Sequence, residues 1–294
     1  MERPSDSLGL SSSALPLLRD VIHDRLGLFY DPPRFDTLAD RLAPLVVARG
    51  FDSYLDYYYL LKYDEDADDE WLRVIDALSV NETYFWREID QIQAVARVVV
   101  PALLRERPRD TVRIWSIPCA TGEEPLTIAM ALDQAGMFER GAIQIHASDA
   151  SPAAIDKARL GRFRERSFRN LPPELRARYF ERDGETWTVN SSLQQRVTTW
   201  SVVNLMAEAE VAPRAHVQII FCRNVFIYFS PAGVQRVIRE LERLTPTPAY
   251  LCVGASESLL RAETRFTLDE IGGAFVYVKR DAASATGRSD NHHD

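Results

Sequence analysis

Arg223 and Asn224 stand where a run of apolar residues, 217–221, stops. A second apolar run, rich in aromatic residues, follows at once and extends to Phe229. Buried parallel strands read as short apolar runs, and ligands bind at their carboxyl ends. A guanidinium and an amide in this position therefore predict a small-molecule site. The alternative interpretation is a strand end capped by a surface salt bridge.

A second polar segment follows the strand predicted over residues 112–117. Residues 118–125 read PCATGEEP, and Pro125 suits the first turn of a helix. Doubly wound folds bind a nucleotide-like cofactor at this position, but the loop lacks the G-x-G-x-x-G glycines and carries Glu123 and Glu124. Two carboxylates would repel a pyrophosphate, so the loop suits a cationic cofactor without phosphate, such as S-adenosylmethionine. The alternative is a helix N-terminus capped by the two glutamates.

Two further strand-like runs also end in polar residues. Asp149 follows the run 143–147, where a carboxylate typically binds ribose hydroxyls; the alternative is that it caps the next helix. Asn204 and Leu205 follow the run 197–203. An asparagine can hydrogen-bond an adenine edge and a leucine can pack on its face, although a turn-forming asparagine is the default interpretation.

The segment 81–87 reads NETYFWR and lies between a helical region and a strand-rich region. Three adjacent aromatic residues followed by Arg87 indicate the wall of a cleft. The alternative is that the aromatic side chains pack in a core while Arg87 forms a salt bridge, because aromatic residues dominate protein cores.

The elements that must position these residues fall into two regions. Residues 1–80 are predicted to form an all-helical domain, because apolar residues recur at helical spacing from residue 14 onward. From about residue 111, apolar strand-like runs alternate with helical segments, which predicts a doubly wound, mostly parallel α/β sheet covered by helices on both faces. The runs span residues 112–117, 143–147, 197–203, 217–221, 250–253 and 275–278.

Three smaller features complete the predicted architecture. Residues 266–268 and 275–278 are separated by a hairpin-like interval, which predicts an antiparallel last strand. The Asp183-Gly184 turn predicts a small antiparallel insertion over about residues 183–203. The polar tail 282–294 is predicted to be disordered.

Composition excludes several classes of protein. The net charge of -8 argues against general nucleic-acid binding, which depends on neutralising phosphates. No run of about 18 apolar residues predicts a membrane span, and the polar first 13 residues lack a signal-peptide core. The 3 cysteines are scattered, which predicts neither a disulfide framework nor a zinc site. We therefore expect a cytoplasmic protein with no metal centre.

The polar segments together, in this order, resemble the CheR-type chemoreceptor glutamate methyltransferases. The most specific matches are TGEEP and FCRNVxIYF, and the resemblance covers roughly residues 15–281. The matching segments are residues 81–87, 120–125, 148–149, 221–229 and 256–258. The resemblance implies a class I methyltransferase domain over residues 81–281, with a seven-stranded sheet, S-adenosylmethionine as cofactor and S-adenosylhomocysteine as product.

The family's site residues carry over to matching positions of this chain. Arg87 and Tyr228 are implied to lie nearest the methyl acceptor. The implied cofactor-binding residues are Asn81, Thr83, Arg87, Glu124, Asp149, Asn204, Leu205, Arg223 and Asn224. The implied partner is the cytoplasmic helical domain of a chemoreceptor, faced by basic residues such as Arg34, Arg41 and Arg49, and the chain is expected to be a monomer.

The implied reaction is methylation of glutamate side-chain carboxylates. A glutamate is already ionised near neutral pH, with a reference pKa of about 4.3, so no general base is required. The alternative is a non-catalytic S-adenosylmethionine-binding regulator of a chemosensory-like pathway. A dinucleotide oxidoreductase is a third interpretation, which the missing glycine set and the Glu123-Glu124 pair disfavour.

Overall fold

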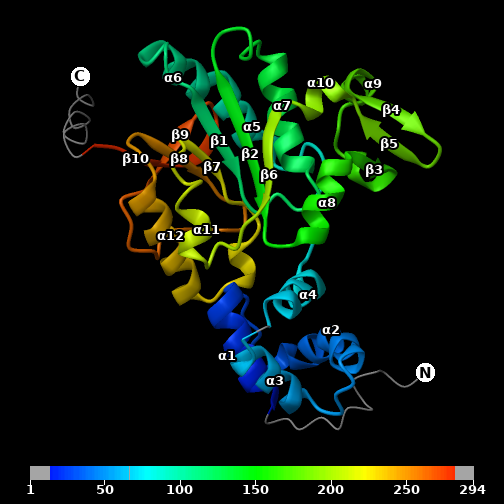
Figure 1. Cartoon of the computed structure of the whole chain (residues 1–294). Coiled ribbons are helices and arrows are strands. Elements are labelled where there is room, and N and C mark those ends of the chain that lie inside the picture. The colour runs from blue at the N-terminus through cyan, green and yellow to red at the C-terminus, as the bar shows by residue number, and fades with distance from the viewer. Residues whose placement is uncertain (1–13, 66, 282–294) are drawn as a thin grey trace.

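The computed structural model describes residues 14–65 and 67–281 (Figure 1). The first 13 residues and the predicted disordered tail 282–294 lie outside the described residues. A helical domain, α1 to α4, lies below a larger domain built around a sheet (Figure 1). The cavity described below lies between these two parts.

The helical domain consists of short helices around one apolar core. They are α1 (Ala14–Leu26), the 3-10 helix η2 (Pro32–Arg34), α2 (Phe35–Ala48), α3 (Tyr54–Tyr63) and α4 (Asp68–Leu78). The Ser53 side chain accepts from Asp56 N and begins α3, and Asp68, Asp69 and Glu70 occupy the first turn of α4, as acidic residues favour. The predicted helical spacing is correct, since Leu18, Ile22, Leu38 and Leu42 are fully buried.

A buried carboxylate lies in this core. Glu70 is inaccessible to solvent and accepts from Tyr57 Oη at 2.7 Å and from Arg49 Nη2 at 2.6 Å. A buried carboxylate is stable only with such partners. Arg49 therefore stabilises the core of the helical domain, and its expected role in facing a partner protein stays a prediction.

The main sheet has seven strands in the order β6-β2-β1-β7-β8-β10-β9. Strands β6, β2, β1, β7 and β8 are parallel, whereas β10 is antiparallel to both β8 and β9. The bounds are β1 (Val112–Ser116), β2 (Ile143–Asp149), β6 (Val197–Val202), β7 (Ile219–Phe221), β8 (Ala249–Cys252), β9 (Thr267–Ile271) and β10 (Ala274–Lys279). The predicted sheet with an antiparallel last strand is confirmed.

Helices cover both faces of this sheet (Figure 1). In β7, Ile219 and Phe221 belong to the core on one face and Ile220 to the core on the other, as the two-residue period of a strand requires. The covering helices are α5 (Ile89–Ala94), the π-helix η3 (Val95–Val99), α6 (Val100–Glu106), α7 (Glu123–Gln134), α8 (Pro152–Leu160), α11 (Glu208–Val211) and α12 (Pro231–Leu244).

A separate small sheet differs from the insertion predicted at 183–203. It contains β3 (Arg162–Arg164), β5 (Thr186–Val189) and β4 (Phe180–Asp183), whereas β6 pairs with β2 at the edge of the main sheet. The sequence conceals β3 because it is short and only Phe163 is buried. The remaining elements are η4 (Glu165–Phe168), α9 (Pro173–Tyr179), α10 (Ser191–Gln194) and η5 (Phe226–Tyr228).

Within residues 14–65 and 67–281, no helix has both the length and the apolar character needed to cross a membrane.

Candidate active site

A cavity of about 240 Å³ lies between the helical domain and the carboxyl ends of β1, β2 and β7. The strand ends contribute Ala120, Asp149 and Arg223, and the helical domain contributes Tyr30 and Arg34. This is the edge of a parallel sheet at which ligands bind.

The loop after β1 borders this cavity and packs closely on the neighbouring elements. Gly122 has φ +99°, and a Cβ there would lie 3.0 Å from Ala158 Cβ and 3.2 Å from the Trp200 ring. Only glycine fits this position, because other residues avoid that backbone conformation and the neighbouring α8 and β6 leave little room. Ala120 N donates to Asp149 Oδ2 at 2.8 Å, which joins the ends of β1 and β2.

Asp149 is a buried carboxylate that does not cap a helix. Its Oδ1 accepts from Ser151 N at 2.9 Å, while the Ser151 hydroxyl accepts from Ala154 N at 3.0 Å and thereby caps α8. Burial raises the pKa of the Asp149 carboxyl, although the amides of Ser151 and Ala120 oppose the shift. Each carboxylate oxygen retains a lone pair, so Asp149 can accept hydrogen bonds from a ligand's hydroxyl groups.

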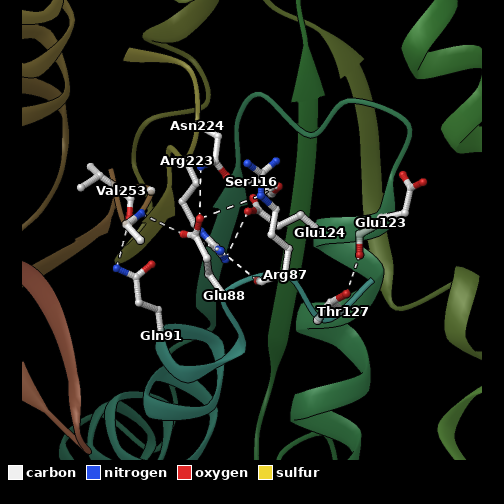
Figure 2. Close-up of polar contacts among 12 residues, drawn as sticks. Arg87, Glu88, Gln91, Ser116, Glu123, Glu124, Thr127, Arg223, Asn224 and Val253 are labelled. Carbon is white, nitrogen blue, oxygen red and sulfur yellow. Dashed lines mark hydrogen bonds and ion pairs between the residues drawn. The ribbon is translucent and has the colours of Figure 1, made fainter. Parts of the chain in front are cut away.

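The two adjacent glutamates of the loop have different environments (Figure 2). Glu123 accepts from Ser167 Oγ at 2.9 Å and from Thr121 Oγ1 at 2.7 Å, and it does not line the cavity. Glu124 lines the cavity, accepts from Ser116 Oγ at 2.7 Å and lies 3.4 Å from Arg223 Nη1. Burial raises the pKa of Glu124, and Arg223 and Ser116 oppose the shift.

Arg223 is the most deeply buried cation of the site. Its side chain is 1% exposed, and Nη2 donates to Arg87 O at 2.9 Å and to Glu88 Oε2 at 3.1 Å (Figure 2). Nε and Nη1 have no hydrogen-bond acceptor among the described residues. Nη1 has the Glu124 carboxylate 3.4 Å away, whereas Nε has no partner, and an unsatisfied buried donor of a charged group is costly, so Nε indicates an anionic ligand group.

Glu88 was not predicted from the sequence, yet it joins several parts of this wall. Its Oε2 accepts from Ala255 N at 3.0 Å as well as from Arg223, and its Oε1 accepts from Asn224 Nδ2 at 3.3 Å. Burial alone would raise the pKa of Glu88, but Arg223, the Asn224 amide and the Ala255 amide together lower it. Glu88 therefore remains a carboxylate that holds Arg223 and Asn224 in place.

Glu257 is a second residue whose role the sequence did not reveal, although Ser256-Glu257-Ser258 was recognised as a matching segment. Its carboxylate accepts from Asn224 N at 2.8 Å, Phe226 N at 2.7 Å and Gly254 N at 2.6 Å. Asn224 has φ +60°, an uncommon conformation for a residue other than glycine, so such support is needed. Glu257 thus determines the path of the chain that leads to Tyr228.

The aromatic residues of segment 81–87 lie both in a core and on the wall of the cavity. Phe85 is fully buried and packs against Phe163, Phe168 and Phe180 at ring distances of 4.8, 5.1 and 4.9 Å. Tyr84, in contrast, lines the cavity.

Arg87 also lines the cavity, and the backbone on both sides of it is strained. Trp86 has φ +68° and Glu88 has φ +46°, and such residues persist only where their surroundings hold them. The Arg87 guanidinium donates to Glu82 O at 2.9 Å and lies 5.6 Å from the centre of the Tyr84 ring. Its side chain is 28% exposed, so it faces the open part of the cavity.

Asn204 is bound within the protein. Its Nδ2 donates to Arg25 O at 2.7 Å, and its Oδ1 accepts from Met206 N at 3.0 Å. The turn-forming interpretation therefore accounts for both ends of its amide, which also links α1 to the sheet domain. The hydrogen bond to an adenine edge stays a prediction.

All predicted site residues line this one cavity. They are Asn81, Thr83, Arg87, Glu124, Asp149, Asn204, Leu205, Arg223, Asn224 and Tyr228. They come from segments that are far apart in the sequence and meet because parallel strands end at the same edge. The individual roles of these residues in binding or catalysis stay predictions.

Two family models match the chain, one on each side of the cavity. Residues 13–79 match the CheR methyltransferase all-alpha domain, and residues 81–272 match the CheR methyltransferase SAM binding domain. The chain belongs to the CheR methyltransferase family.

Relatives of this CheR-family chain match over most of its length. Chemotaxis protein methyltransferase 2 of Vibrio cholerae is 31% identical, with 92% of this chain and 94% of that protein covered. The chemotaxis protein methyltransferase of Escherichia coli is 29% identical, with 90% and 91% covered. The probable biofilm formation methyltransferase WspC of Pseudomonas putida is 31% identical, with 90% of this chain but 61% of that protein covered.

The polar groups of this CheR cavity fit S-adenosylmethionine, the cofactor of the domain. Arg223 Nε, which has no hydrogen-bond acceptor among the described residues, suits its carboxylate, Glu124 suits its ammonium group, and Asp149 suits the two ribose hydroxyls. A pyrophosphate would meet the carboxylates of Glu124 and Asp149 instead, which disfavours a dinucleotide.

Proposed function

We propose that this chain methylates glutamate side chains of a chemoreceptor or a related chemosensory protein, with S-adenosylmethionine as the methyl donor. The observation that carries the proposal is the charge of the cavity wall. Four arginines line it, namely Arg34, Arg41, Arg87 and Arg223, against the three carboxylates of Glu82, Glu124 and Asp149, and its described lining contains no histidine or lysine. Such a wall suits an acceptor that is already an anion.

The proposed chemistry needs no proton transfer before the methyl group moves. When bound, S-adenosylmethionine supplies a methyl group on a sulfonium centre. A glutamate acceptor is ionised near neutral pH, because its reference pKa is about 4.3. The protein must then align the carboxylate and exclude water from it.

Arg87 is proposed to orient the acceptor carboxylate. A guanidinium can donate two parallel hydrogen bonds to one carboxylate, which fixes its direction. Arg87 already donates to Glu82 O at 2.9 Å and lies 3.9 Å from Glu88 Oε1. Because Glu88 offsets part of the positive charge, the acceptor would be aligned without losing all of its nucleophilic character. Tyr228, which lines the same cavity, is proposed to position either partner.

The remaining cavity residues are proposed to bind the cofactor. Asp149 would accept from the ribose hydroxyls, Glu124 would bind the ammonium group, and Arg223 with Asn224 would close the carboxylate end. Leu205 and Asn204 would lie beside the adenine, and Asn81 and Thr83 would complete the wall opposite the sheet.

The proposed partner is the cytoplasmic helical domain of a chemoreceptor or of a related signalling protein, and the chain is proposed to act as a monomer in the cytoplasm. The names of the Vibrio and Escherichia relatives, both chemotaxis protein methyltransferases, support this assignment. Arg34 and Arg41 line the cavity from the helical domain and would face an acidic acceptor segment.

The test is transfer of a tritium-labelled methyl group from S-adenosylmethionine to a purified chemoreceptor cytoplasmic fragment. We expect label in the fragment that mild alkali releases as methanol, because a glutamate methyl ester is base-labile. Label that resists alkali would overturn the glutamate assignment.

Calorimetric titration with S-adenosylhomocysteine, with NAD as control, separates the alternatives. Binding of S-adenosylhomocysteine without any methyl transfer would favour a non-catalytic regulator. Binding of NAD in preference to S-adenosylhomocysteine would contradict both.

A further inference from the structure

The turn after α1 is paired with the segment that carries Tyr228. Phe29 N donates to Tyr228 O at 2.8 Å, and Leu28 forms an isolated antiparallel bridge with Phe229. Figure 1 shows α1 reaching from the helical domain to the underside of the sheet domain beside α12. We call residues 27–29 the latch turn.

Two side-chain hydrogen bonds hold the end of α1, directly before this turn, against the sheet domain. His23 Nε2 lies 2.8 Å from Ser230 Oγ, and Ser230 is the N-cap of α12. Asn204 Nδ2 donates to Arg25 O at 2.7 Å. The latch turn therefore follows a fixed helix end and is itself paired with residues 228–229, so it cannot shift without breaking contacts between the two domains.

Gly27 is the closest point of this interface. It has φ +76°, and a Cβ at this position would lie 2.5 Å from Phe229 Cε2 and 2.8 Å from Phe229 Cζ. No side chain fits there unless the Phe229 ring moves. The Phe229 ring packs edge-on against Phe226, with ring centres 6.2 Å apart, so a shift of this ring would disturb η5, which carries Tyr228.

Tyr228 is thus held from two directions. On the sheet side, Glu257 accepts from Phe226 N at 2.7 Å and anchors the start of η5. On the helical side, the latch turn binds the Tyr228 carbonyl at the end of η5. Removing the second support leaves the cofactor-facing carboxylates intact but frees the residue proposed to lie beside the acceptor.

We propose that the latch turn is a positioning element for Tyr228, through which the helical domain controls the rate of methyl transfer in addition to any docking of the acceptor. The inference rests on the proposed function for the role of Tyr228 alone. It predicts that disturbing the latch turn lowers kcat while cofactor affinity is retained, since Asp149, Glu124 and Arg223 lie on other elements.

The test compares Gly27→Ala with Gly50→Ala. Gly50 has φ +73°, close to the +76° of Gly27, but a Cβ there would meet nothing within 4 Å. Both substitutions impose similar backbone strain in the same domain, and only Gly27→Ala presses on Phe229. We expect Gly27→Ala to lower kcat on the chemoreceptor fragment by about 10-fold or more, as misplacement of a positioned group does. Gly50→Ala should leave kcat unchanged.

A second substitution tests whether Gly27→Ala acts on kcat through the Phe229 ring. Phe229→Leu shortens the side chain that Gly27→Ala would strike, so the double variant should recover most of the kcat of Phe229→Leu alone. An equal loss of kcat in Gly50→Ala, or no recovery in the double variant, would overturn the inference. Should Gly27→Ala fail to fold, His23→Ala removes the neighbouring contact to Ser230 and should lower kcat with unchanged S-adenosylhomocysteine affinity.

Hydrogen exchange separates failure of this inference from failure of the proposed function. In Gly27→Ala, peptides covering residues 27–30 and 225–230 should exchange faster than in the wild type, whereas Gly50→Ala should change neither. This measurement needs no acceptor. If the wild type labels no acceptor, the proposed function fails; if exchange in both peptides stays at the wild-type rate in Gly27→Ala, the latch inference fails.

Discussion

The cavity has two walls of different construction. The strand-end wall, formed by Glu124, Asp149 and Arg223, consists of buried charges bound by groups of the sheet domain and of the adjoining segment 87–88. The wall that we propose faces the acceptor, formed by Arg87 and Tyr228 and called the acceptor wall, depends on strained backbone and on contacts between domains. The side chain of Arg223 is 1% exposed and that of Arg87 is 28% exposed.

This difference in construction indicates that the two walls have different roles. Buried charges that are fixed in advance suit tight binding of one small ligand, because no further ordering is required when it binds. Partly exposed groups held from two domains suit an acceptor that arrives on another protein. Substitutions in the strand-end wall should therefore affect cofactor affinity, and those in the acceptor wall should affect turnover.

The largest expected effect is that of Arg223→Ala. Its removal leaves the carboxylates of Glu88 and Glu124 without their shared cation, which costs about 3–5 kcal/mol when a buried pair is broken. We expect a large fall in thermal stability and loss of S-adenosylhomocysteine binding by calorimetry. Arg243→Ala is the matched control, because Arg243 forms its ion pairs at the surface and its loss should leave unfolding nearly unchanged. Similar melting temperatures for the two variants would contradict the buried-charge account of this wall.

Asp149→Ala should weaken S-adenosylhomocysteine binding by about 100-fold or more, because each hydrogen bond to a charged acceptor contributes about 1.5–3 kcal/mol. Ser151→Ala supplies the contrast. It removes the cap of α8 and the hydrogen bond from Ser151 Oγ to Asp76 Oδ1, and should cost about 2–4 kcal/mol of stability without changing cofactor affinity. Retained affinity in Asp149→Ala would disprove the ribose assignment.

Arg87→Ala should lower kcat by about 100-fold, the scale expected when the group that aligns a reactant is lost. Its S-adenosylhomocysteine affinity should change much less. A smaller loss is expected for Arg169→Ala, since Arg169 reaches Arg87 only indirectly, through the Tyr84 ring at 3.7 Å and an ion pair with Glu82 at 3.5 Å. Equal losses of affinity and kcat in Arg87→Ala would place this arginine in the strand-end wall instead.

The smallest effect concerns pH. Burial raises the pKa of Glu124 in the folded protein above its ordinary value. The protonated Glu124 carboxyl therefore stabilises the fold fully below the pKa of the unfolded chain, and this stabilisation is lost as pH rises through the pKa of the folded protein. Glu124→Gln should therefore unfold at a slightly higher temperature than the wild type near neutral pH. The advantage should shrink as pH falls toward about 4, because the wild-type carboxyl is then protonated as well. If the difference in melting temperature between Glu124→Gln and the wild type grew on acidification, the pKa of Glu124 would not be raised in the folded protein.

Much of the strand-end wall was predictable. Arg223 and Asp149 stand directly after apolar strand runs, and parallel strands end at one edge, so their meeting follows from the alternating pattern. The mostly parallel sheet and its antiparallel last strand were predictable for similar reasons, whereas the order of the strands was not predicted. The small sheet was misplaced because β3 has three residues and a single buried side chain, which leaves too little periodicity to detect.

The residues that hold the site residues in place were harder to predict from the sequence. Glu88 and Glu257 are ordinary exposed-type residues in the sequence, and their role comes from backbone amides that lie far away along the chain. Glu123 and Glu124 are identical in type and adjacent, so only the direction of the first turn of α7 decides which one lines the cavity.

By itself, the sequence determined the two-region plan, the sheet, and the residue types that line the cofactor side, since these depend on local periodicity and on the ends of strands. The tertiary structure alone decided that Gly27 presses against Phe229 and that Phe29 binds Tyr228. The physical reason is that these contacts join segments about 200 residues apart. One uses backbone groups, which every residue type carries, and the other depends on a distant aromatic ring, so no local pattern reveals either.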